Sequence, residues 1–180
     1  RPDLILHAMD AGARGVIVPM INTAEEAQRV VRAVKYYPEG DRSNGGQRGD
    51  WGKDFANYRE YLDTANREML IVVMIETKQA LANIDEICAV PGVDVLFVGG
   101  GDLAQTMGYP GNKNAPEVQV VVRETIARII AAGAVPGYAC EQEIREFAGL
   151  GVRYFHTGMT PLIKFAAREY WKLVGEQRVK

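Results

Sequence analysis

The feature that most constrains the fold of this chain is an alternation of short apolar runs with longer segments of helical periodicity. Five runs, at residues 15–20, 70–75, 93–98, 134–138 and 152–156, are almost continuously apolar. Such runs are typical of strands that are covered on both faces. Strands that alternate with helical segments indicate parallel βα units. We therefore expect an α/β fold in which residues 1–180 form a single domain around one core.

Helical periodicity accounts for most of the chain between the apolar runs. Thr23 followed by Glu26 has the pattern of a capping box at the start of one of these helices. The expected helices are residues 4–11, 23–36, 57–66, 79–89, 116–132, 142–149 and 160–173. Residues 37–52 and 99–112 are expected to be loops, and a glycine-rich loop as long as 37–52 is usually functional or mobile.

Five βα units are too few to close an eight-stranded barrel. The chain is therefore either an open, doubly wound sheet or a (β/α)8 TIM barrel that lacks about the first three units. Arg1-Pro2-Asp3 leads directly into a helix with no strand before it, which favours a barrel sequence that begins midway.

Composition excludes several classes of protein. The formal net charge of −2 offers no field that would gather nucleic acid or an anionic membrane. No segment approaches the roughly 20 consecutive apolar residues of a membrane span. Cys88 and Cys140 match no metal-ligand spacing and are expected to be free thiols. A cytoplasmic protein with a small-molecule substrate fits these observations.

Two carboxylates follow apolar runs, and they are the strongest candidates for a functional site. Glu76 follows IVVMI, and Asp102 follows VLFVGGG. The carboxyl ends of parallel strands share one face, where sites are usually built. Paired carboxylates suit Mg²⁺ or Mn²⁺, with water and substrate oxygens as further ligands. Because both residues also stand where helices begin, helix capping is an equal alternative at this point.

The glycines before Asp102 favour the functional interpretation. Gly99, Gly100 and Gly101 allow the backbone to approach a ligand and present N–H groups to an anion such as a carboxylate. The run does not match the dinucleotide pattern GxGxxG. In the polar loop, Arg42 and Arg48 could bind a second carboxylate or a neighbouring subunit, although a solvated turn is the simpler interpretation of each.

Four segments together resemble one known family. They are DAGARGVIVPMINTAEEA, YYPEGDRS, IET after a buried strand, and GVDVLFVGGGDLAQTMGYPGN. In order and spacing they resemble the HpcH/HpaI aldolases, class II pyruvate aldolases that include 4-hydroxy-2-oxoheptanedioate aldolase and 2-dehydro-3-deoxyglucarate aldolase. The resemblance runs from about Asp10 to the last helix.

The resemblance implies a metal-dependent carbon–carbon lyase built on a (β/α)8 barrel. It places a divalent metal (Mg²⁺, Mn²⁺ or Co²⁺) on Glu76 and Asp102, and the carboxylate of pyruvate on Gly101 and Asp102. It assigns Asp10 to the support of a catalytic histidine, and we expect Arg42 to contact substrate. It also implies a homo-oligomer, commonly a hexamer, in which the closing helix at residues 158–180 packs on a neighbouring subunit.

The sequence departs from the family pattern at three points. Neither the catalytic histidine nor the substrate-binding arginine of the family is found in it, and Arg1 is not that arginine. The loop reads GGGDL rather than GPADL or GPSDL, and Met74 replaces a common glutamine. Two alternatives therefore stand beside the aldolase: a citrate-lyase-type enzyme acting on a CoA thioester, and a non-catalytic metal-binding barrel fragment.

Overall fold

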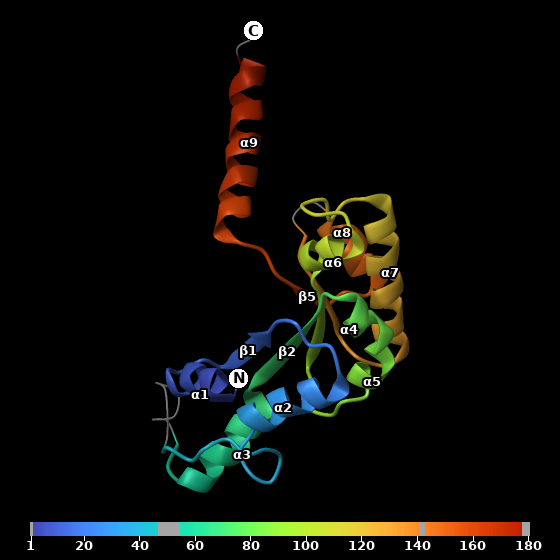
Figure 1. Cartoon of the computed structure of the whole chain (residues 1–180). Helices are drawn as coiled ribbons and strands as arrows, with labels where there is room; N and C mark the ends of the chain where they lie inside the picture. The colour runs from blue at the N-terminus through green and yellow to red at the C-terminus, as the bar shows by residue number, and fades with distance from the viewer. Residues whose placement is uncertain (1, 47–54, 141–142, 178–180) are drawn as a thin grey trace.

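The computed structural model describes residues 2–46, 55–140 and 143–177, and these contain one parallel sheet. Its five strands are β1 (Gly15–Val18), β2 (Leu70–Ile75), β3 (Val95–Val98), β4 (Pro136–Tyr138) and β5 (Tyr154–Phe155). They pair in chain order, β1-β2-β3-β4-β5, and the sheet curls as in part of a barrel (Figure 1). A doubly wound sheet needs a reversal of strand order, so that alternative is wrong.

Helices connect the strands, as the sequence predicted, although the bounds differ by a few residues. They are α1 (Pro2–Asp10), α2 (Ala24–Val34), α3 (Tyr58–Glu68), α4 (Lys78–Ala82), α5 (Ile84–Cys88), α6 (Gly100–Met107), α7 (Pro116–Ala131), α8 (Ile144–Leu150) and α9 (Met159–Gln177). Thr23 caps α2 and accepts a hydrogen bond from the N–H of Glu26, which confirms the expected cap.

Two expectations about these connections were wrong. Residues 99–112 are not a continuous loop, because Leu103 and Ala104 are buried and α6 forms around them before ending at Gly108, whose φ is 94°. The single helix expected at 79–89 is divided into α4 and α5 at Asn83, whose side chain donates to the carbonyl of Asn22.

The core lies mainly between the sheet and its helices. Ile71, Val73 and Ile75 of β2 are fully buried in the large cluster that the helices complete. A smaller cluster around Val72 and Phe97 occupies the other face of the sheet and consists of residues in or just after strands. Both faces of the central strands are therefore covered, as their continuous apolar runs indicated.

The last helix stands apart from this body. Figure 1 shows α9 projecting away from the sheet and its covering helices. Large apolar side chains are exposed along it, among them Ile163, Tyr170 and Trp171, which are 61–64% exposed. Among the described residues, no helix has the length and apolar character needed to cross a lipid bilayer. Arg48 lies outside the described residues, as do the last three residues of the expected 158–180 helix.

Candidate functional site

Glu76 extends from the carboxyl end of β2 and is almost completely buried, with 2% of its surface exposed. The backbone N–H of Met20, just after β1, donates to its Oε1 at 2.7 Å. Its Oε2 is buried, and no described group bonds to it. Glu76 does not cap a helix, because the N-cap of α4 is Thr77, whose hydroxyl accepts from the N–H of Ala80. The capping alternative is therefore wrong for this residue.

The surroundings of Glu76 disfavour its negative charge. Burial is the largest cause and raises the pKa of its carboxyl above the ordinary value. The hydrogen bond from Met20 acts in the opposite direction, and the charge of Asp102 raises the pKa further. Glu76 and Asp102 therefore act on each other as like charges across the ends of neighbouring strands. A cation shared by the two would relieve this repulsion.

The backbone after β3 lies directly against Glu76. A Cβ added at Gly99 would fall 2.5 Å from Oε2 of Glu76 and 2.7 Å from its Cβ, so a side chain at this position would displace the carboxylate. Gly101, two residues later, has open space around it. The first glycine of the triplet is therefore required by a close approach, whereas the third leaves room for a ligand.

Asp102 is exposed and lies in the first turn of α6, whose N-cap is Gly99. Asp102 is therefore not the N-cap that the alternative interpretation required. Gly99 makes no side-chain cap, and the first backbone bond in the helix runs from Leu103 N–H to the Gly99 carbonyl. The N–H groups of residues 100–102 consequently have no acceptor within the helix and form a favourable place for an anion.

Tyr138 is a further residue at this edge that sequence reasoning missed. It ends β4, and its hydroxyl lies where a Cβ on Gly100 would be 3.1 Å away. Gln119 of α7 donates to that hydroxyl at 3.1 Å. Burial raises the pKa of Tyr138, so the phenol stays neutral at ordinary pH. The available signal was a polar-tipped aromatic residue at the end of the run AVPGY.

The donor set at this edge fits a hard divalent cation that keeps other ligands from water or substrate. Within the described ranges there is no group of three or more His, Cys, Asp or Glu side chains that could enclose a metal. Two carboxylates, one with a buried and unpartnered oxygen, are what Mg²⁺ or Mn²⁺ uses when substrate completes its coordination.

Asp10 and Arg42 are brought together, but away from Glu76 and Asp102. Nη2 of Arg42 lies 3.1 Å from Oδ1 of Asp10, and the Arg42 side chain is 1% exposed. Its guanidinium also lies over the ring of Tyr36, at 4.7 Å from the centroid. Asp10 ends α1 ahead of β1, so the pair lies toward the amino ends of the strands. Glu76 follows a carboxyl end.

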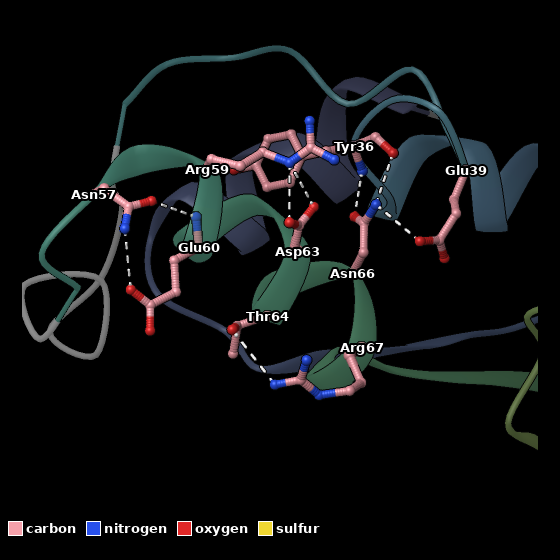
Figure 2. Close-up of polar contacts among 9 residues, drawn as sticks. All are labelled: Tyr36, Glu39, Asn57, Arg59, Glu60, Asp63, Thr64, Asn66 and Arg67. Atoms are coloured by element: carbon pink, nitrogen blue, oxygen red, sulfur yellow. Dashed lines mark hydrogen bonds and ion pairs between the residues drawn. The ribbon is translucent and has the colours of Figure 1, made fainter.

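A hydrogen-bonded asparagine supports the region around Tyr36. Asn66 of α3 accepts from the Tyr36 N–H at 2.7 Å and donates to its carbonyl at 2.9 Å (Figure 2). It also donates to Glu39 at 3.2 Å. These bonds fix the end of α2 against α3, and Arg42 packs on the same tyrosine. The position favours a structural role for the ion pair, and the substrate and catalytic roles expected of Arg42 and Asp10 stay predictions.

Comparison with known proteins shows that this chain is similar to aldolases. The pattern of the family described as HpcH/HpaI aldolase/citrate lyase matches residues 2–145. The chain is 43% identical over 135 residues to a 4-hydroxy-2-oxovalerate aldolase of Rhodococcus jostii, covering 74% of this chain and 51% of that protein. It is 36% identical over 160 residues to a hydroxypyruvate/pyruvate aldolase of Roseovarius nubinhibens, covering 88% and 62%. The chain thus spans 51% and 62% of the length of these two relatives.

Solved structures agree with this similarity. An HpcH/HpaI aldolase/citrate lyase family protein from Burkholderia cenocepacia aligns with a TM-score of 0.83 at 29% identity, covering 99% of this chain and 70% of that one. An HpcH/HpaI aldolase from Desulfitobacterium hafniense aligns with a TM-score of 0.80 at 27% identity, covering 96% and 68%.

Proposed function

This chain belongs to the HpcH/HpaI aldolase/citrate lyase family, and we propose that it carries the metal-binding part of a class II aldolase site. The proposed reaction cleaves a 4-hydroxy-2-oxo acid to pyruvate and an aldehyde. Its support is the geometry at the strand ends together with sequence similarity to relatives that are named as aldolases of 2-oxo acids.

The observation that carries the proposal is the free oxygen of Glu76. A buried carboxylate oxygen with no hydrogen-bond partner costs free energy unless something positive meets it. The charge of Asp102, which has the same sign, acts on this carboxyl and raises its pKa further. Glu76 and Asp102 would hold a divalent cation, which when bound supplies Lewis-acid stabilisation of negative charge on an oxygen of the 2-oxo acid.

The residues of the chain itself would bind and orient the substrate. The N–H groups of residues 100–102 would donate hydrogen bonds to the substrate carboxylate, and the open space beside Gly101 leaves room for it. The neutral hydroxyl of Tyr138 lies behind Gly100, so it supports the start of α6 from within the core. The amino end of α6 would thereby fix the direction of the bond to be cleaved.

Two finer features of the assembly belong to this proposal. A complete (β/α)8 barrel containing these five units is supported by the sequential parallel sheet and by structural neighbours of greater length. Association of copies is supported by α9, because a projecting helix with 61–64% exposed Ile163, Tyr170 and Trp171 has apolar surface to bury. The expectation of a hexamer comes from the family resemblance. A cytoplasmic location stays a prediction.

The test is Mn²⁺ binding and pyruvate release measured on the same preparations. The unsubstituted chain should bind Mn²⁺, detected by the loss of the free-ion electron paramagnetic resonance signal, whereas Glu76→Gln and Asp102→Asn should weaken binding at least tenfold. Pyruvate release from a 4-hydroxy-2-oxo acid should require Mn²⁺. Release from a CoA thioester instead would favour the citrate-lyase-type reaction. Unchanged Mn²⁺ affinity in both variants would overturn the assignment.

A further inference from the structure

The segment after β1 holds an unusual backbone conformation. Among the described residues, Met20 is the one non-glycine residue with a positive φ, at 58°. The left-handed region is unfavourable for a residue with a Cβ and uncommon for a large side chain. The Met20 side chain is 53% exposed, so packing of the thioether does not force the conformation. The cause of the left-handed conformation must therefore lie in the interactions of the backbone at Met20.

The turn directs the backbone of Met20 at Glu76. The N–H of Met20 donates to Oε1 at 2.7 Å, and the next residue, Ile21, donates to the carbonyl of Met74 at 3.3 Å. β1 and β2 are paired up to Val18 and Val73, so the chain leaves the ladder just before it reaches the level of Glu76. One oxygen of the carboxylate is thereby tied down, and Oε2 is left as the free oxygen.

Asn22 holds this turn in place from several sides. Its Nδ2 donates to the carbonyl of Met20 at 3.0 Å, and its own N–H donates to Glu26 of α2 at 2.7 Å. Its Oδ1 accepts a hydrogen bond from the Thr77 hydroxyl, and its carbonyl accepts from Asn83 at 2.8 Å. The polar groups of Asn22 thus connect the turn to α2, to the residue after Glu76, and to the junction of α4 and α5.

We propose that Met20 and Asn22 are positioning residues for Glu76: Asn22 keeps Met20 in the left-handed conformation, and the Met20 N–H fixes the rotation of the Glu76 carboxylate. The role of Glu76 as a metal ligand rests on the proposed function, whereas the anchoring of its side chain does not. Groups that orient a ligand commonly influence metal affinity by tenfold or more. The role of Met20 belongs to its backbone, so its side chain can vary within the limits set by φ.

The experiment uses the full chain with two readouts. The first is hydrogen exchange of the amide at position 20, measured by NMR in the absence of metal. The second is Mn²⁺ affinity from electron paramagnetic resonance. Asn22→Ala should remove the protection of this amide and raise the dissociation constant for Mn²⁺ about tenfold. Adding Met20→Gly to this variant should restore part of the amide protection and part of the Mn²⁺ affinity, because glycine occupies positive φ without the penalty of a Cβ.

A second substitution keeps the test decisive if Asn22→Ala does not fold. Met20→Val introduces a β-branched residue that resists the left-handed region, and the exposed side chain should otherwise tolerate the exchange. It should lower amide protection and weaken Mn²⁺ binding while circular dichroism stays unchanged. Asn66→Ala is the matched control, because it removes an asparagine with comparable backbone bonds beside Tyr36 (Figure 2). It should lower stability and leave both readouts unchanged.

The outcomes separate this proposal from the proposed function. Equal Mn²⁺ affinity and equal protection in the unsubstituted, Asn22→Ala and Met20→Val chains would overturn the positioning role. The positioning role would also be overturned if Met20→Gly, added to Asn22→Ala, restored neither the amide protection nor the Mn²⁺ affinity. Protection that Asn22→Ala abolishes, in a chain that does not bind Mn²⁺, would support the anchoring of Glu76 and overturn its role as a metal ligand.

Discussion

Two buried charges in this chain have opposite surroundings. Arg42 is enclosed with Asp10 at 3.1 Å and the Tyr36 ring beneath its guanidinium, although its Nε and Nη1 bond to no described acceptor. Glu76 is also buried, but the charge that acts on it is that of another carboxylate, Asp102. Burying a charge is costly in both places. Where the fold supplies the opposite charge the residue can serve stability, and where it supplies a like charge a proton or a bound cation would relieve the cost.

The largest effect on this contrast should come from Asp10→Ala. It leaves Arg42 buried without its counter-charge and should lower the free energy of unfolding by about 3 kcal/mol. Urea denaturation measures the change, and Asp10→Ala combined with Arg42→Met should recover much of it. Asp63→Ala is the control, because the exposed Arg59–Asp63 pair (Figure 2) contributes less than about 0.5 kcal/mol. Equal losses in the two single variants would refute the contrast.

The next largest effect should separate the first and third glycines of the triplet that precedes Asp102. Gly99→Ala places a Cβ 2.5 Å from Oε2 of Glu76 and should lower the free energy of unfolding by about 2 kcal/mol. It should also abolish Mn²⁺ binding. Gly101→Ala meets nothing within 4 Å and should be neutral or slightly stabilising. Thermal denaturation of the two variants gives the comparison. Similar melting temperatures would mean that the approach of the β3 end to Glu76 is looser than described.

A smaller effect is expected from Tyr138→Phe, which removes the hydroxyl that Gln119 donates to while keeping the ring in place. The loss should be about 1 kcal/mol, the usual contribution of one neutral hydrogen bond. Chemical denaturation measures it, and Tyr61→Phe provides a control at another buried tyrosine, whose ring packs on Tyr36 at 6.1 Å between centroids. If the hydroxyl supports α6, exchange of the amides at 100–102 should also accelerate in Tyr138→Phe alone.

The smallest effect should have the opposite sign. The raised pKa of Glu76 means that the folded chain binds a proton more tightly than the unfolded chain. Its contribution to stability is therefore present at acidic pH and is lost as pH rises through the folded-state pKa. In the absence of metal, Glu76→Gln should be slightly more stable than the unsubstituted chain at neutral pH, with less dependence on pH. A less stable Glu76→Gln chain at pH 7 would contradict the unfavourable surroundings described for this carboxyl.

Local patterns were sufficient to locate the strands and the two carboxylates that follow them, but not every neighbour of those carboxylates. The apolar runs identified all five described strands, because burial on both faces leaves a direct record in composition. The run GGGDLAQTM was misread as loop, because its three glycines concealed a helix that forms around buried Leu103 and Ala104. Likewise, nothing in the sequence indicated that the helix would divide at Asn83, because the hydrogen bond from Asn83 to Asn22 joins distant parts of the chain.

By itself the sequence determined the parallel βα fold, the strand ends that bear Glu76 and Asp102, and the family pattern. These depend on periodicity and on residues that are close in the chain. The tertiary structure decided that Glu76 and Asp102 are not helix caps, that Asp10 pairs with Arg42, and that Met20 holds Glu76 across 56 positions of sequence. Such contacts depend on how separate units pack, and hydrogen bonds between distant segments leave no periodic trace in the sequence.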